Sequence, residues 1–134
     1  MQTSLLESSI YALNYVAGSW LNGGYDYTRQ GNSHPLISPY TVFSTVDSEY
    51  LVIGVATDAQ FATFTKVLGL EHLASEPRFI TNKARCENNA ALHKELQGVI
   101  GSWQSAELHS IFKAHGVPFS SINSMKQLFA APEV

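Results

Sequence analysis

Charged residues are scarce in this sequence: they make up 14% of 134 residues, against about a quarter in typical globular proteins. The eight lysines and arginines are scattered and form no basic run, which argues against a nucleic-acid-binding surface. Hydrophobic residues account for 45% of the chain, enough for one hydrophobic core. Low charge combined with this hydrophobic content favours a buried part of something larger over a free-standing small domain.

Cysteine is nearly absent, because Cys86 is the single one and no disulfide can form within the chain. This usage fits a reducing compartment. Hydrophobic runs are short, and nothing approaches the ~20 apolar residues of a membrane span. The apolar stretch 5–21 also lacks the cationic flank of a signal peptide. We therefore expect an intracellular protein, either cytoplasmic or, in a eukaryote, mitochondrial, with neither membrane nor nucleic acid as a partner.

Metal-site and phosphate-loop motifs are missing as well. No pair has the His-x-x-x-His or Cys-x-x-Cys spacing of a metal site, and Gly23-Gly24 lies in no phosphate-binding glycine pattern. We expect no metal site and no tightly bound cofactor. Four histidines are interpreted as structural or solvent-facing: His72, His93, His109 and His115. Cys86 is expected to be an inert thiol, the alternative being a lowered pKa in a first helical turn.

The N-terminal stretch predicts one helix. Ser4-x-x-Glu7 has the form of a capping box, apolar residues follow at helical spacing, and Gly23-Gly24 ends the pattern. Because apolar residues occur on several flanks, this helix is expected to be buried on more than one face. Residues 1–24 are therefore interpreted as a helix of a larger domain, followed by a polar linker over 25–38.

Residues 39–134 predict an α+β fold. Tyr40–Thr45 and Tyr50–Val55 are rich in aromatic and β-branched residues and flank a turn-like segment, so they predict an antiparallel hairpin. Residues 117–122 form a possible third strand. Strands and helices do not alternate as in βαβ units, which favours a small antiparallel sheet packed with several helices.

The helices of this region are predicted mainly from their ends. Thr57-x-x-Gln60 is a second capping box, for a helix stopped by Gly69. A short helical turn and loop are expected over 70–81, and a long helix from about Lys83 to Gly101. The last two helices are expected to begin at caps on Ser105 and Ser124 and to end at Gly116 with Pro118 and at Pro132.

The run Gly31-Asn32-Ser33-His34-Pro35-Leu36-Ile37-Ser38-Pro39-Tyr40 is the main candidate site. Gly31 permits unusual φ values, and Asn32 with Ser33 can reverse the chain. His34 can donate a hydrogen bond to a carboxylate or a phosphate. The alternative interpretation is a polar linker with a capping histidine.

Two later segments carry further candidates. In Thr81-Asn82-Lys83-Ala84-Arg85, Arg85 either contacts an anionic group near a helix N-terminus or pairs with a nearby acid such as Glu76 or Glu87. In Gly116-Val117-Pro118 through Ile122-Asn123, a helix end is the favoured interpretation, and Asn123 either caps the last helix or lines a cleft.

These three segments, in this order, resemble the class III CoA-transferases, the formyl-CoA transferase and CaiB/BaiF group. The resemblance covers nearly the whole chain, which would be about a third of such an enzyme and would comprise its small domain. It implies transfer of CoA from an acyl-CoA, with succinyl-CoA as a candidate donor, to a free carboxylic acid through an aspartyl-CoA intermediate. Acyl-CoA is then a substrate, and the enzyme is an interlocked homodimer.

The resemblance implies that the catalytic aspartate lies in the large domain, so we assign no catalytic residue to this chain. Gly31, Asn32, His34 and Arg85 are the expected substrate-binding residues. Two alternatives stay open: a part of an α-methylacyl-CoA racemase-like enzyme, whose acid/base pair would also lie elsewhere, and a non-catalytic small-domain remnant that acts as an interaction module.

Overall fold

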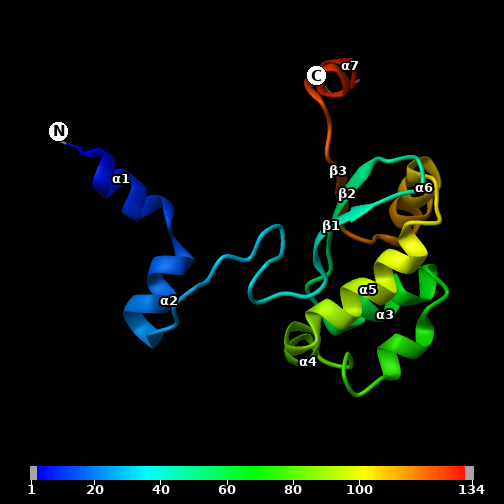
Figure 1. Cartoon of the computed structure of the whole chain (residues 1–134), viewed down its shortest axis with the longest axis horizontal. Helices are drawn as coiled ribbons and strands as arrows, with labels where there is room; N and C mark the ends of the chain where they lie inside the picture. The colour runs from blue at the N-terminus through cyan, green and yellow to red at the C-terminus, as the bar shows by residue number, and fades with distance from the viewer. Residues whose placement is uncertain (1–2, 132–134) are drawn as a thin grey trace. The chain divides into compact units, whose positions relative to one another are not determined.

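The structure is a computed structural model that describes residues 3–131. The chain divides into two compact units, residues 1–30 and 31–134 (Figure 1). The boundary between them falls inside the linker expected over 25–38. Each unit is described by itself below.

The first unit contains two short helices, α1 (Leu5–Ala12) and α2 (Tyr15–Gly23). The Oγ of Ser4 accepts a hydrogen bond from the Glu7 backbone N–H at 3.1 Å, so the predicted N-cap is confirmed. The single helix expected across this stretch is divided at Asn14, whose φ of 45° lies outside the helical range. Neither helix has a buried residue. Their apolar side chains are therefore largely open to solvent in this chain.

The second unit is built on a three-stranded antiparallel sheet in the order β1-β2-β3. Its strands are β1 (Tyr40–Ser44), β2 (Tyr50–Gly54) and β3 (Phe119–Ser121). Phe43 lies opposite Leu51 in the β1–β2 pair. The predicted hairpin, the predicted third strand and the α+β class are thus confirmed.

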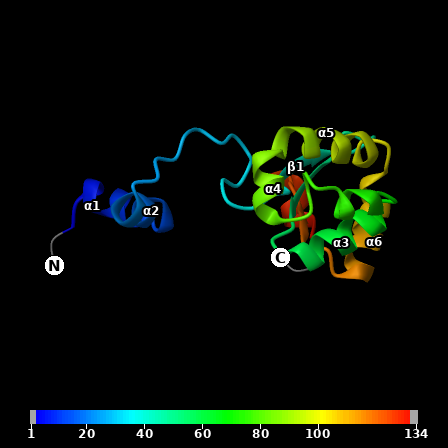
Figure 2. The ribbon, with the colours of Figure 1, turned by 90° about the horizontal axis from the view of Figure 1, so that it is seen from below.

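Helices complete the second unit. They are α3 (Asp58–Val67), the 3-10 helix η1 (Glu71–Ser75), α4 (Asn82–Glu87), α5 (Asn89–Ile100), α6 (Ser105–His115) and α7 (Met125–Ala130). Figure 2 shows α4 and α5 in succession along one side of this unit, with α3 beside α6. The buried hydrophobic core consists of Phe43, Leu51, Ile53, Val55, Phe61, Phe64, Leu68, Leu73, Phe79, Leu92, Leu96, Ile100, Leu108, Phe112 and Val117.

Several helix ends match the sequence pattern. Thr57 and Gln60 form the reciprocal capping box of α3, and Ser124 caps α7. Gly69 follows α3 with a φ of 71°, and Gly116 ends α6 with a φ of 66°, values that glycine adopts without strain. The stop predicted at Pro132 lies outside the described residues.

The long helix expected from Lys83 to Gly101 is two helices, α4 and α5, divided at Asn88. Asn88 leaves the helical range with a φ of −111° and a ψ of 24°. Its side-chain amide donates to the carbonyl oxygens of Ala84 at 2.9 Å and Arg78 at 3.3 Å. These bonds tie the end of α4 to the preceding loop, and the break gives α4 a direction of its own.

The Ser44 end of the outer edge of β1 is paired by a side-chain amide. Gln97 of α5 donates from Nε2 to the Ser44 carbonyl at 2.8 Å and accepts at Oε1 from the Ser44 N–H at 3.1 Å. At this residue the amide takes the place of a neighbouring strand, which protects part of an edge that is otherwise open to unwanted pairing.

Asp47 joins the hairpin turn to the start of α6. Its carboxylate accepts hydrogen bonds from the Ser105 backbone N–H at 3.2 Å, from Ser105 Oγ at 2.7 Å and from the Thr45 hydroxyl. The cap expected from Ser105 is replaced: Gln104 is the N-cap residue, and Asp47 satisfies the Ser105 N–H from outside the helix. The hydroxyls of Thr45 and Ser105 lower the pKa of Asp47 from 3.8 to about 2.

Because the pKa of Asp47 is lower in the folded chain, its contribution to stability is full above about pH 4 and is lost as the pH falls toward about 2. We expect Asp47→Asn to have a flatter dependence of Tm on pH across this window than the parent chain. Thermal unfolding followed by circular dichroism at several pH values tests this, with Asp26→Asn as the charge-matched control. Identical pH profiles for the parent and Asp47→Asn would contradict it.

Candidate functional site

The candidate loop over residues 31–40 is closed on itself at its base. The His34 backbone N–H donates to the Tyr40 carbonyl at 2.9 Å, and Ser33 Oγ donates to Thr41 Oγ1 at 3.3 Å. Gly31 has a φ of 61°, which is the left-handed conformation expected of it. Asn32 is exposed at the start of the loop. The loop therefore leads from a left-handed turn directly into β1.

The imidazole of His34 has a defined orientation in this loop. The Leu36 backbone N–H donates to His34 Nδ1 at 3.1 Å, so the proton of the neutral ring lies on Nε2. The ring also stacks on Tyr40, with 5.3 Å between ring centroids and an interplanar angle of 6°. The Tyr40 ring in turn lies over Gly54, where an added Cβ would stand 3.4 Å from the ring atoms. A hydrogen bond and an aromatic stack thus fix one histidine.

Side chains from α4 and α5 hold the second half of the loop. Asn82 Nδ2 donates to the Leu36 carbonyl at 2.8 Å, and Asn82 Oδ1 accepts from the Ser38 N–H at 3.1 Å. Ser38 Oγ donates to Asn89 Oδ1 at 2.7 Å, and Arg85 Nε donates to the Ser38 carbonyl at 2.7 Å. We call Asn82, Arg85 and Asn89 the loop clamp. Every polar group of Ser38 is bonded to it.

Arg85 is fully buried, although it carries a charge. Besides its bond to Ser38, it donates from Nη1 to the Phe79 carbonyl at 3.0 Å and from Nη2 to Asp58 Oδ1 at 2.8 Å. The guanidinium carbon also lies 4.3 Å from the centroid of the Phe61 ring. Buried arginines need such complete pairing, because an unpaired charge is costly to remove from water.

The acid partner of Arg85 differs from both expected ones. Glu76 pairs with Arg78, and Glu87 with Lys83 at 3.9 Å, so the pairing expected with Glu76 or Glu87 is wrong. The partner is Asp58, at the start of α3, which no local sequence pattern connects with Arg85 because the two lie 27 residues apart. Through its bond to Ser38, Arg85 acts on the backbone of the loop that carries His34.

The third sequence motif lines a separate polar cleft of about 260 Å³. The cleft lies among the hairpin, α6, β3 and α7, and Asn123 lines it, while Ser124 is the residue that caps α7. In the same cleft His109 Nε2 and Ser121 Oγ form a hydrogen bond of 2.9 Å. No sequence pattern indicated this pair, since its partners belong to different elements.

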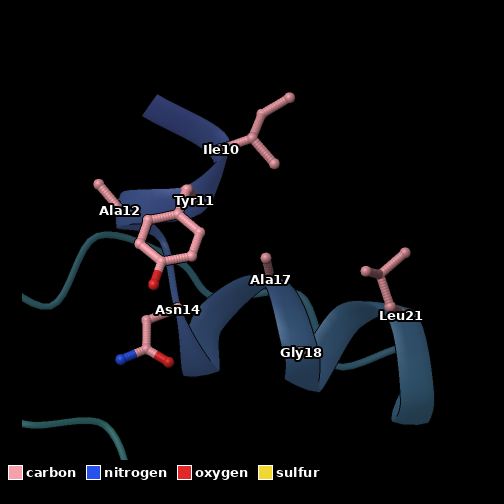
Figure 3. Close-up of a pocket in the computed structure, with 7 residues that line it drawn as sticks. All are labelled: Ile10, Tyr11, Ala12, Asn14, Ala17, Gly18 and Leu21. Atoms are coloured by element: carbon pink, nitrogen blue, oxygen red, sulfur yellow. The ribbon is translucent and has the colours of Figure 1, made fainter. Parts of the chain in front are cut away.

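The first unit carries an open surface pocket of about 520 Å³. Figure 3 shows its lining: Ile10, Tyr11 and Ala12 come from α1, Ala17, Gly18 and Leu21 from α2, and Asn14 from their junction. Apart from Asn14 and the hydroxyl of Tyr11, this lining is apolar. It is an exposed apolar surface rather than an enclosed site.

Metal and thiol chemistry find no support in the described part of the chain. Among residues 3–131, no group of three or more histidine, cysteine, aspartate or glutamate side chains is arranged to hold a metal ion. Burial raises the pKa of the Cys86 thiol, partly offset by the charge of Arg85, which agrees with an inert thiol. No helix in this range is long and apolar enough to cross a membrane.

Comparison with known proteins decides the family. The family model described as CoA-transferase family III matches residues 1–134. The chain belongs to CoA-transferase family III. Its polar loop, loop clamp and α+β core are therefore features of a family III chain.

Individual relatives agree with this assignment. The chain is 39% identical to an acyl-CoA transferase of Fusarium pseudograminearum, over 99% of this chain and 29% of that protein. It is 35% identical to the succinyl-CoA:glutarate CoA-transferase of Homo sapiens, over 98% of this chain and 30% of that protein. A crystal structure of a CaiB/BaiF family protein from Brucella suis, 35% identical, matches with a TM-score of 0.81 over 97% of this chain and 34% of that one. The chain thus spans about a third of the length of these relatives.

The loop clamp gives a stability prediction. Arg85→Leu leaves the buried carbonyls of Ser38 and Phe79 without donors, so we expect a loss of about 3 kcal/mol. Asp58→Asn is expected to cost about 1 kcal/mol, because the Asp58 side chain is largely exposed and the amide can still accept. Urea unfolding measures both. The control is Lys83→Ala, which removes only a solvent-exposed ion pair; an Arg85→Leu chain as stable as this control would refute the structural role.

Proposed function

We propose that this chain is part of an enzyme that transfers CoA from an acyl-CoA, with succinyl-CoA the favoured donor, to a free carboxylic acid. The support is the family membership together with relatives whose names state this reaction with dicarboxylic acids, among them a succinate–glutarate CoA-transferase of Agrobacterium fabrum. The substrates are acyl-CoA and an acid, and we propose a homodimer as the working form.

The proposed chemistry is covalent catalysis by a carboxylate. An enzyme aspartate attacks the thioester carbonyl, the CoA thiolate leaves, and a mixed anhydride forms. The thiolate then attacks the aspartyl carbonyl, which gives an aspartyl-CoA thioester and releases the donor acid. The acceptor carboxylate attacks this thioester, the CoA thiolate leaves again, and an anhydride with the acceptor forms. The thiolate then attacks the acceptor's acyl carbon, which gives the acceptor's CoA thioester and releases the aspartate.

We place the nucleophilic aspartate outside residues 1–134. Asp58 is paired with Arg85, and Asp47 accepts hydrogen bonds from Thr45 and Ser105. Asp26 belongs to a segment that carries none of the three family motifs. No residue of this chain is proposed as the nucleophile.

The loop over residues 31–40 is the proposed contribution of this chain to substrate binding. The observation that carries it is the orientation of His34, whose ring is fixed by Leu36 and Tyr40 with its proton on Nε2. A neutral imidazole N–H suits a carboxylate oxygen of the acid or an oxygen of the acyl-CoA. Gly31 shapes the start of the loop, and Asn32 lines the approach of the substrate to His34. Arg85 supports the loop from its buried side.

A second candidate function is that of an interaction module. The exposed apolar side chains of residues 5–21 favour it, since contiguous apolar surface marks contact sites. They include Leu5, Leu6, Ile10, Tyr11, Leu13, Tyr15, Trp20 and Leu21. The two functions differ in whether a full-length protein that contains this segment converts acyl-CoA.

The 134-residue chain by itself is expected to show no CoA transfer, because the proposed nucleophile is elsewhere. Incubation with succinyl-CoA and glutarate, with separation of the thioesters by chromatography, measures this. Transfer by the purified chain would contradict the placement of the nucleophile. A protein of the relatives' full length that contains this segment and still shows no transfer would instead favour the interaction module.

His34→Ala in an enzyme of full length is expected to raise the KM for the acceptor acid by about ten- to a hundredfold, the usual effect of losing a hydrogen bond to a charged group. Steady-state kinetics with varied acceptor tests it. His115→Ala is the matched control, because His115 is exposed and, among residues 3–131, its ring bonds only to the Ile111 carbonyl of its own helix. An unchanged acceptor KM would leave His34 with a structural role alone.

A further inference from the structure

Leu36 is held between two side chains through its backbone. Its N–H donates to His34 Nδ1 at 3.1 Å, and its carbonyl accepts from Asn82 Nδ2 at 2.8 Å. The Leu36 side chain is 48% exposed, so burial of that side chain does not fix the residue. The two hydrogen bonds define where the Leu36 peptide lies, and only the bond to Asn82 comes from outside the loop.

Asn82 is itself fixed by several contacts. It is the first residue of α4, and the Thr81 side chain caps this helix. Its Oδ1 accepts from the Ser38 N–H at 3.1 Å, and Ser38 is held in turn by Arg85 and Asn89. The side-chain amide of Asn82 thus donates to the Leu36 carbonyl at one end of the Leu36–Ser38 segment and accepts from the Ser38 N–H at the other. An aspartate here would still accept from Ser38 but would place an oxygen against the Leu36 carbonyl.

We infer that Asn82 is a positioning residue for His34, which acts through the Leu36 peptide to hold the imidazole in its Nε2–H form. Nδ1 accepts from Leu36 only while it carries no proton, so a correctly placed Leu36 N–H selects this tautomer. Displacing the Leu36 peptide removes the selection without touching His34. The use of this tautomer in substrate binding rests on the proposed function of His34. The existence of the tautomer does not depend on that function.

The experiment is a nitrogen NMR measurement on the 134-residue chain labelled with ¹⁵N, at a pH where histidine is neutral. Long-range ¹H–¹⁵N correlations identify which ring nitrogen of His34 carries the proton. We expect an unprotonated Nδ1, a protonated Nε2 and a coupling across the bond from Leu36 N–H to Nδ1 in the parent chain. In Asn82→Asp this single tautomer is lost, and the two nitrogen shifts move toward each other.

Two variants separate this proposal from a general loosening of the fold. Asn88→Ala removes an amide at the far end of α4 that bonds to Ala84 and Arg78 rather than to the loop, so it leaves the His34 pattern unchanged. Tyr40→Leu removes the ring stack and keeps the Leu36 bond, so it also retains the tautomer. Backbone amide shifts of β1 and β2 report that each variant is folded.

A protonated Nδ1 in the parent chain would overturn the proposal without any variant, as would an unchanged tautomer in folded Asn82→Asp. Loss of the tautomer in Tyr40→Leu but not in Asn82→Asp would assign the positioning to the stack instead. None of these readouts involves substrate. An unchanged acceptor KM in His34→Ala would therefore refute the proposed role of His34 in acceptor binding and leave the tautomer result standing.

Discussion

The guanidinium of Arg85 joins three separate segments of the second unit. Its nitrogens reach Asp58 at the start of α3, the Phe79 carbonyl before α4, and the Ser38 carbonyl at the end of the polar loop. Removing this cation from water is costly, and the cost is met only when all three acceptors are in place. Partly assembled arrangements are thereby disfavoured. The buried charge fixes one geometry, which an apolar side chain of similar volume would not do.

A short series of hydrogen bonds connects the buried Arg85 with the exposed part of the loop. Arg85 and Asn89 fix Ser38, Asn82 fixes Leu36, and Leu36 fixes the His34 ring, while Gly31 and Asn32 lie exposed at the start of the same loop. One end of the loop is therefore tied to the core by hydrogen bonds, and the other end is exposed. In the binding role proposed for this loop, the oriented imidazole of His34 is the fixed donor.

Local sequence signals predicted the parts of the fold that local interactions decide. The hairpin, the Thr57–Gln60 box and the glycine ends at Gly69 and Gly116 each depend on residues a few positions apart. The helix break at Asn88 was missed, because its amide bonds to Arg78, ten residues earlier. For the candidate site, sequence patterns indicated the loop over residues 31–40 and Arg85. It missed the Asp58 partner and the role of Asn82, since both depend on contacts across 27 to 46 residues.

Charged residues are scarcest in the part of the chain that the structure buries least. Residues 1–30 contain only Glu7, Asp26 and Arg29 as charged residues, and the two helices of this unit bury none of their side chains. In the second unit, by contrast, the apolar residues close around a core of their own. An apolar segment without a core gains stability only by covering its surface with other chain segments. Since the relatives named above are about three times as long as this chain, the cover we propose for this apolar surface is the rest of such an enzyme.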